Sequence, residues 1–281
     1  FFSGTQLDRR AQLQTLLRVV LFLGLLRVAF WLGLESPLKK LGILGGPIIR
    51  IWIIAVAMAS GLFIPSLGRR LRAALLGLAA FILLWPLVYL RDWASGWLPA
   101  LVGAIVVGLL WVWKVSTRAA VFTYLMVVLS GPLFYVIARG LAQDDVWSLD
   151  TRIIALRGLT TLLEGRWLLG LGLAAYWHYW RDVIGQMSYI DPATGYFHFT
   201  LNPTVNTHNN YLDVLGQMGV LGLVVFLWLL AALAYQGLRS FLAEAPGFGR
   251  AYAAACVGGL AGMAFSGLLG DWIIPFVYNI G

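Results

Sequence analysis

The chain reads Thr207-His208-Asn209-Asn210-Tyr211-Leu212-Asp213-Val214-Leu215-Gly216-Gln217-Met218-Gly219-Val220-Leu221-Gly222 where a long polar and aromatic segment meets a strongly apolar one. The apolar part continues to about residue 235, which predicts a membrane helix. Thr207 is expected to be the N-cap, with His208 in the first helical position. Helical spacing places His208 on the same face as Leu212, Leu215 and Gly219. The imidazole is therefore expected at the N-terminal end of the helix, next to a row of apolar side chains. This position suits a functional histidine and a solvated histidine at a membrane interface equally well.

The composition indicates an integral membrane protein. Of the 281 residues, 60% are hydrophobic and only 11% are charged, whereas a soluble domain carries roughly 25% charged residues. Arg and Lys at cytoplasmic helix ends account for much of the net charge of +8, so no nucleic-acid partner is needed to explain it. The single cysteine, Cys256, excludes an internal disulfide and a multi-cysteine metal site. The start without Met and the end just after an apolar run predict that both ends are cut and that some helices are missing.

Seven apolar segments predict an all-α fold, a multi-helix transmembrane bundle. The expected spans are 12–34, 48–66, 73–90, 97–113, 119–138, 211–235 and 251–270. With the N-terminus inside, the loops on the outer side hold only three Lys or Arg residues, namely Lys39, Lys40 and Arg91. The cytoplasmic side then holds nine: Arg9, Arg10, Arg69, Arg70, Arg72, Lys114, Arg118, Arg239 and Arg250.

This charge bias places the segment 139–210 on the periplasmic face of a bacterial inner membrane. The chain is then organised as N-terminal transmembrane helices (1–138), a periplasmic loop region (139–210) and C-terminal transmembrane helices (211–281). Within the loop region, the Leu-rich stretches 153–163 and 167–173 predict short helices on the membrane surface.

Several side chains in or near the outer region are candidates for ligand binding. Arg152 and Arg157 flank an apolar turn, and planar guanidinium groups suit phosphate or pyrophosphate. Arg50 and Arg91 lie toward the outer ends of predicted spans, where snorkelling to lipid head groups is the alternative. Aromatic residues around His178 and His198 could stack on sugars or sit among head groups. The sequence has no P-loop, dinucleotide fingerprint or His-Glu-x-x-His motif, so neither a cofactor nor a metal is expected.

Four stretches of the sequence resemble motifs of the O-antigen ligase and O-antigen polymerase superfamily of membrane glycosyltransferases. Residues 207–222 are similar to its signature His-Asn-x-x-Leu followed by Glu or Gln-x-Gly-x-x-Gly. Upstream, Arg152-x-x-x-x-Arg157-Gly158-Leu159 and Leu168-Leu169-Gly170-Leu171-Gly172 resemble its Arg-x-x-x-Trp and Pro-Leu-x-Gly-Val-Gly segments, with Leu156 and Trp167 in place of the usual Trp and Pro. Residues 94–98 resemble its Ser-Arg-Gly stretch but lack the Arg.

The resemblance implies inverting transfer of a glycan from a polyprenyl-diphosphate donor to an acceptor hydroxyl, such as that of a glycan or a lipid A-core. It implies that cations stabilise the diphosphate leaving group without a metal, and that His208 deprotonates or orients the acceptor hydroxyl. The catalytic residues would then be Arg152, Arg157 and His208. The substrate-binding residues would be Asn209, Asn210, Arg50, Arg91, Trp177 and Trp180.

Two questions stay open at this point. The motifs do not distinguish a ligase from a polymerase or a protein O-glycosyltransferase, because these enzymes differ in the acceptor. A transporter or flippase of lipid-linked sugars would also use outer arginines. Such a protein usually shows repeated halves and helices broken near the membrane midplane, and the sequence indicates neither. A structural membrane subunit without chemistry is a further alternative.

Overall fold

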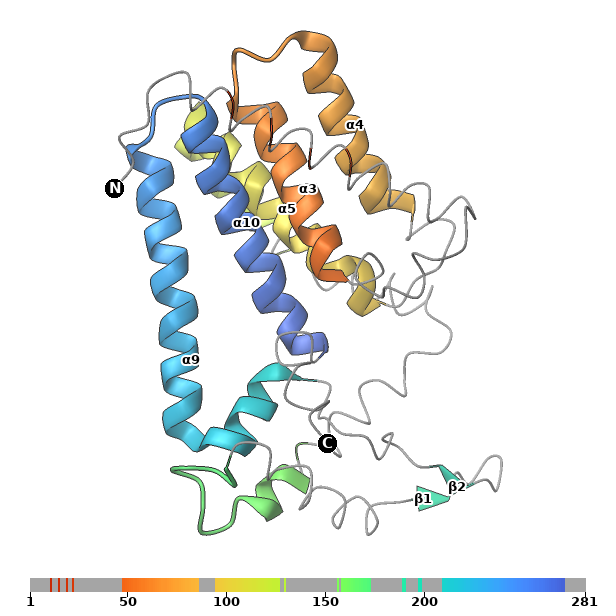
Figure 1. Cartoon of the computed structure of the whole chain (residues 1–281), viewed down its shortest axis with the longest axis vertical. Coiled ribbons are helices and arrows are strands. Elements are labelled where there is room, and N and C mark those ends of the chain that lie inside the picture. The colour runs from red at the N-terminus through yellow and green to blue at the C-terminus, as the bar shows by residue number, and fades with distance from the viewer. Residues whose placement is uncertain are drawn as a thin grey trace. The chain divides into compact units, whose positions relative to one another are not determined.

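The structure, a computed structural model, describes residues 47–85, 94–126, 158–172 and 209–270, two short strands at 189–190 and 197–198, and the helical positions 11, 15, 19, 22, 129 and 156. Nearly all of these residues are helical (Figure 1). The labelled elements are α3 (Pro47–Phe63), α4 (Arg69–Trp85), α5 (Ala94–Val115), β1 (Tyr189–Ile190), β2 (Phe197–His198), α9 (Asn210–Ala243) and α10 (Phe248–Leu269). The strands pair antiparallel, with Tyr189 opposite His198. The chain forms two compact units, one of residues 1–135 and 233–265 and the other of residues 136–232 and 266–281.

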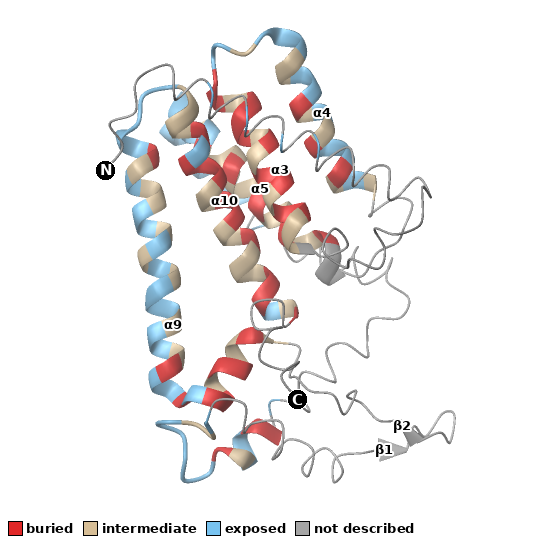
Figure 2. Ribbon diagram, viewed as in Figure 1, coloured by how far each residue is buried: buried red, intermediate tan, exposed pale blue. Residues whose placement is uncertain are grey.

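Three of the described helices are long and apolar enough to cross a membrane, namely Trp97–Val115 within α5, α9 and α10. They overlap the predicted spans 97–113, 211–235 and 251–270, although α9 runs on to Ala243. The long part of α9 exposes large apolar side chains such as Val224 and Trp228 along its length (Figure 2). A row of exposed apolar side chains of this kind suits lipid tails rather than water. The helices therefore indicate a membrane protein.

The remaining predicted spans agree in part. The span 48–66 is α3, which begins at Pro47, one residue before the predicted start, and ends at Phe63, just before Pro65. The next span was expected from residue 73, but α4 already begins at Arg69, because its first turn is rich in arginines, which favour helices yet lie outside an apolar run. Residues 117–126 are helical, with Ser116 Oγ accepting a hydrogen bond from the Ala119 amide at 3.3 Å. Most of 12–34, the segment 86–90 and most of 127–138 lie outside the described residues.

Close backbone packing joins α5 and α10 in the first unit. A Cβ atom at Gly103 would lie 2.8 Å from the carbonyl oxygen of Gly258, and one at Gly262 would lie 2.7 Å from the carbonyl oxygen of Pro99. Gly258 and Gly262 are four residues apart and so share one face of α10. Small residues on one face let two membrane helices approach closely, where van der Waals packing replaces the hydrophobic effect.

Three basic turns of the chain meet at one end of the first unit. The Phe63 ring at the end of α3 packs edge-on against Phe241 of α9, with ring centroids 5.3 Å apart. Lys114 Nζ, at the end of α5, lies 5.3 Å from the centroid of the same Phe241 ring. The side chain of Arg72 donates hydrogen bonds to the carbonyl of Ile64, and that of Arg250 donates to the carbonyl of Glu244. We call this end the basic end, and its described cations are Arg69, Arg70, Arg72, Lys114, Arg118, Arg239 and Arg250.

Replacing Gly103 by leucine should lower the thermal midpoint of the purified chain. The added side chain meets the backbone of Gly258, which cannot rotate away, and overpacking of this kind costs about 1–3 kcal/mol. Gly108→Leu on the same helix is the matched control, since a Cβ atom there has no atom within 4 Å. Both midpoints are measured in one detergent, and equal midpoints for the two variants would contradict the close approach of α5 and α10.

Candidate functional site

Asn209 is the N-cap of α9. Its Oδ1 accepts hydrogen bonds from the amides of Tyr211 at 2.9 Å and Leu212 at 3.2 Å, which satisfies two of the unpaired amides of the first turn. Its Nδ2 donates to the carbonyl of Leu268 at 3.3 Å, which ties the start of α9 to the end of α10. The prediction that Thr207 caps this helix is therefore wrong. The cap lies two residues later because an asparagine in that position bonds the first turn directly.

The helix α9 is broken at Gly219. This residue has φ 67° and ψ −167°, which is far from helical geometry and lies in the region that glycine tolerates. The break separates a short first part, 210–218, from a long second part, 220–243, and the bend is visible in Figure 1. The prediction of one continuous helix over 211–235 is therefore wrong at Gly219. Apolar periodicity did not indicate the break, because an isolated glycine is also tolerated inside a continuous helix.

A loop docks into the break through its backbone. The amide of Leu171 donates to the carbonyl of Gly216 at 2.9 Å, and the amide of Gly172 donates to the carbonyl of Gln217 at 3.0 Å. On the other side of the break, the amides of Val220 and Leu221 donate to the carbonyls of two earlier loop residues, Trp167 at 2.8 Å and Leu168 at 3.3 Å. In an unbroken helix, the amides of Val220 and Leu221 would donate to the carbonyls of Gly216 and Gln217. The loop thus replaces both lost helical bonds.

The docking requires glycine on both sides. A Cβ atom at Gly170 would lie 2.5 Å from the amide nitrogen of Gly219, and one at Gly219 would lie 2.4 Å from the carbonyl oxygen of Leu168. Gly170 and Gly172 also have positive φ, 72° and 101°. The segment 167–173 was predicted as a short helix, and this prediction is wrong for the described residues 167–172. The amides of Leu171 and Gly172 and the carbonyls of Trp167 and Leu168 bond α9, and among these described residues only the amide of Gly170 bonds back to the local carbonyl of Arg166.

Apolar side chains support the docked loop. Leu159 and Leu163 are fully buried and pack with Leu171 of the loop and with Leu212 and Leu215 of α9. Residues 158–162 are helical, which agrees with the predicted short helix at 153–163. The leucine face of α9 is thus turned toward the loop region of the same unit.

A second face of the short first part of α9 is polar and buried. Asn210, Asp213 and Gln217 lie at positions i, i+3 and i+7, and their side chains are at most 3% exposed. Ser266 of α10 is 1% exposed, and a Cβ atom at the following Gly267 would lie 3.4 Å from Asn210 Nδ2. Among the residues that the structure describes, Asn210 Oδ1 and Nδ2 and Ser266 Oγ are buried without a hydrogen-bond partner. We call these four residues the polar cluster.

Three of the predicted site residues belong to the described part of the chain. Asn209 and Asn210 lie together at the start of α9, as expected from adjacent positions. Arg50 lies in the first turn of α3 in the first unit, where it is 3% exposed. The predicted residues His208, Arg152, Arg157, Arg91, Trp177 and Trp180 lie outside the described residues.

Sequence reasoning missed Asp213 and Ser266 as members of a buried polar cluster. The signal for Asp213 was present, because Asn210, Asp213 and Gln217 recur at helical spacing within an apolar stretch. Ser266 carries no such signal, since a lone serine among small residues is common in membrane helices. Among the described residues, no group of three or more His, Cys, Asp or Glu side chains lies close enough to hold a metal ion.

No family model, no curated protein and no solved structure matches the chain.

Replacing Gly219 by alanine should destabilise the second unit. A positive φ with ψ near 180° is a conformation that essentially only glycine adopts and costs another residue about 1–3 kcal/mol, and the added methyl group would also overlap the Leu168 carbonyl. Gly77→Ala is the control, since Gly77 lies inside α4 with no atom within 4 Å of a Cβ atom, and alanine is favoured over glycine in a helix. Limited proteolysis of the full chain in detergent measures the effect. Cleavage near residue 170 should accelerate in Gly219→Ala only, and unchanged cleavage in that variant would contradict the docked loop.

Proposed function

We propose that the chain is a membrane glycosyltransferase that moves a glycan from a polyprenyl-diphosphate donor to an acceptor hydroxyl, in the manner of an O-antigen ligase or polymerase. The observation that carries the proposal is the contact between residues 167–172 and 216–221. These two glycine-containing stretches were matched to the superfamily separately, from sequence alone. Their mutual hydrogen bonding supports the view that they form one functional element.

The same contact supports a common site for the proposed catalytic residues. Arg157 directly precedes Gly158, which is buried and stands next to the buried Leu159. His208 directly precedes Asn209, which is bonded to α9 and α10. Both anchored neighbours belong to the second unit. The short chain distance from each anchor favours an arginine and a histidine that act on one substrate.

In the proposed reaction, an oxygen of the acceptor attacks the anomeric carbon of the donor sugar. The bond from that carbon to the diphosphate oxygen breaks, and the hydroxyl proton passes to His208 as general base. Negative charge then builds on the polyprenyl diphosphate, where Arg152 and Arg157 stabilise it with planar, bidentate guanidinium groups. Arg50 and Arg91 are proposed as further diphosphate contacts, and Trp177 and Trp180 as stacking partners for sugar rings.

The polar cluster suits a hydroxylated ligand. Leaving a buried polar group without a hydrogen bond costs about 1–3 kcal/mol, and Asn210 and Ser266 together present both donors and acceptors without partners among the described residues. A sugar hydroxyl both donates and accepts, so it would satisfy this pair. Asn209 has fewer groups left to bind a ligand, because its Oδ1 and one Nδ2 proton already form hydrogen bonds with α9 and α10.

The distribution of charge supports a periplasmic site. The basic end gathers seven of the nine cations that the sequence assigned to the cytoplasm, and it lies at the turns that end α3, α5 and α9. The start of α9 is at the other end of that helix. By the positive-inside rule, this charge supports the proposed periplasmic position of the segment that precedes α9 in a bacterial inner membrane.

A transporter or flippase of lipid-linked sugars is the second candidate, because transporters commonly contain broken membrane helices and α9 is broken at Gly219. Transporters place such breaks near the membrane midplane, with the freed backbone groups facing the substrate. Here the second part of α9, 220–243, extends about 36 Å at 1.5 Å per residue, which is enough to cross the hydrocarbon core alone. The freed groups are bonded to the loop. The break therefore lies at one end of the span, which favours the transferase.

Arg152→Ala should lower glycan transfer from a lipid-linked donor severely without loss of expression, and Arg152→Lys should restore little. A lysine carries the same charge but cannot form the two parallel hydrogen bonds of a guanidinium group. Arg166→Ala, an exposed arginine of the same unit, is the matched control and should retain transfer. Transfer is measured with purified donor and acceptor in detergent. Normal turnover by Arg152→Ala would show that Arg152 does not stabilise the diphosphate leaving group.

His208→Ala should slow transfer by about 10²–10⁴-fold, the usual contribution of a general base, with donor binding nearly unchanged. The wild-type rate should fall as the pH drops through the imidazole titration, since only the neutral ring accepts a proton. His198→Ala, in β2, is the matched histidine control. Lost donor binding with an unchanged pH profile would indicate that His208 contacts the donor diphosphate instead of the acceptor hydroxyl. Full activity of both His208→Ala and His208→Gln would leave it no catalytic role.

A further inference from the structure

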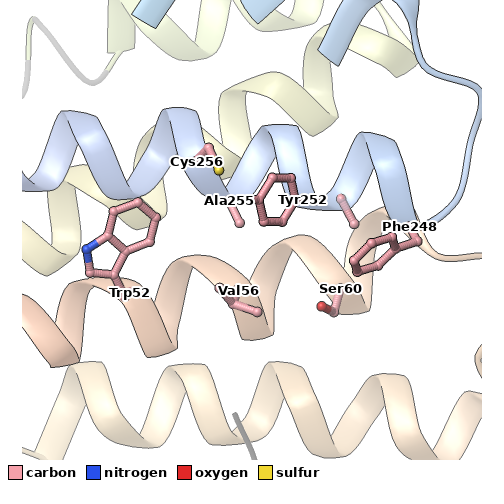
Figure 3. Close-up of a pocket in the computed structure, with 8 residues that line it drawn as sticks. Trp52, Val56, Ser60, Phe248, Tyr252, Ala255 and Cys256 are labelled. Atoms are coloured by element: carbon pink, nitrogen blue, oxygen red, sulfur yellow. The ribbon is translucent and has the colours of Figure 1, made fainter. Parts of the chain in front are cut away.

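A narrow apolar slot lies between α3 and α10 in the first unit (Figure 3). Its volume is about 270 Å³. The helix α3 lines it with Trp52, Val56 and Ser60, one turn apart, and α10 lines it with Phe248, Tyr252 and Cys256 at the same spacing. In Figure 3 the two rows face each other, with Ser60 near Phe248 and Trp52 toward the Cys256 end. From Trp52 to Ser60 the slot is about 12 Å long at 1.5 Å per residue.

The two ends of the slot differ. At one end the Trp52 ring is held in place, because its Nε1 lies 3.2 Å from Met263 Sδ and a Cβ atom at Gly259 would lie 2.5 Å from the ring. The other end, at Ser60 and Phe248, adjoins the basic end. On the side of α3, the carbonyl of Ile64, one turn after Ser60, accepts hydrogen bonds from Arg72. On the side of α10, Arg250 lies in the same turn as Phe248. The slot is thus closed by an indole at one end and flanked by cations at the other.

We propose that this slot holds one acyl chain of an anionic phospholipid, with the head group bound at the basic end. The volume of the slot lies just below the range of roughly 300–1,000 Å³ that is typical of pockets for drug-sized ligands. A slot of this size suits a single acyl chain. A helix of a partner protein or of a second copy, about 10–12 Å wide, is too thick for it. In the turns of the basic end, the described residues include seven cations and only one carboxylate, Glu244. This excess attracts anionic head groups over zwitterionic ones.

The site is independent of the proposed transfer reaction. It lies in the first unit and involves none of the residues proposed for catalysis. The prenyl diphosphate of the proposed donor belongs with the outer arginines, whereas the slot ends beside the cations of the basic end. A bilayer phospholipid is therefore the occupant that both the shape and the charge of the slot support.

Cys256 makes the slot testable, because it is the only cysteine of the chain and lines the cavity. The full chain in a neutral detergent is treated with N-ethylmaleimide, with phosphatidylglycerol or phosphatidylcholine of identical acyl chains added in equal amounts. A lipid at about ten times its Kd leaves about one site in eleven unoccupied, so modification should slow about tenfold. We expect this protection from phosphatidylglycerol and not from phosphatidylcholine.

Three variants separate slot binding from general effects of lipid. Val56→Phe narrows the slot and should lose the protection of Cys256, and Arg69→Gln combined with Arg70→Gln should lose the preference for phosphatidylglycerol. Leu229→Cys in a Cys256→Ala background places the thiol on the exposed face of α9, where both lipids should act alike. Equal protection of Cys256 by both lipids, protection by neither, or protection that survives Val56→Phe would overturn the proposal. Protection by a polyprenyl phosphate instead of phosphatidylglycerol would also overturn it.

Discussion

A helix that breaks inside an apolar surrounding must bond its freed amides and carbonyls elsewhere. In hydrocarbon each unsatisfied backbone group costs several kcal/mol, because no water is present to replace the lost partner. At Gly219 the break frees the carbonyls of Gly216 and Gln217 and the amides of Val220 and Leu221, and residues 167–172 bond all four. The loop and the break therefore depend on each other. The rest of the second unit is arranged around this exchange of backbone bonds.

The break gives the first part of α9 a direction of its own. Its polar face of Asn210, Asp213 and Gln217 can then be buried within the second unit, while the second part of the helix exposes apolar side chains as a membrane span does. Its leucine face packs on Leu159 and Leu163, and its N-cap is bonded to the end of α10. The proposed catalytic residues Arg157 and His208 each adjoin an anchored residue of this unit. A rigid scaffold next to short connecting segments is a common way to position catalytic side chains.

The sequence predicted the helices best where a long apolar run was the only signal needed. α5, α9 and α10 overlap the predicted spans, although α9 runs on to Ala243, and α3 begins within one residue of the predicted position 48. Composition could not predict the cap at Asn209, because Thr207 and Asn209 are both good N-caps and only the bonded geometry decides between them. It could not predict the loop at 167–172 either, since leucine-rich residues favour a helix while the positive φ of Gly170 depends on a partner about 45 residues away. The resemblance drew attention to both stretches, each separately, and did not indicate that they are in contact.

Hydrogen exchange at single amides of the full chain in detergent tests the docked loop most directly. The account predicts slow exchange for Leu171, Gly172, Val220 and Leu221, whose amides are all bonded across the break. Leu168 and Leu169 are the internal reference and should exchange fast, since no backbone carbonyl among the described residues accepts from their amides. Exchange of Leu171 and Gly172 as fast as that of Leu169 would contradict the account, because the loop would then not be bonded to α9.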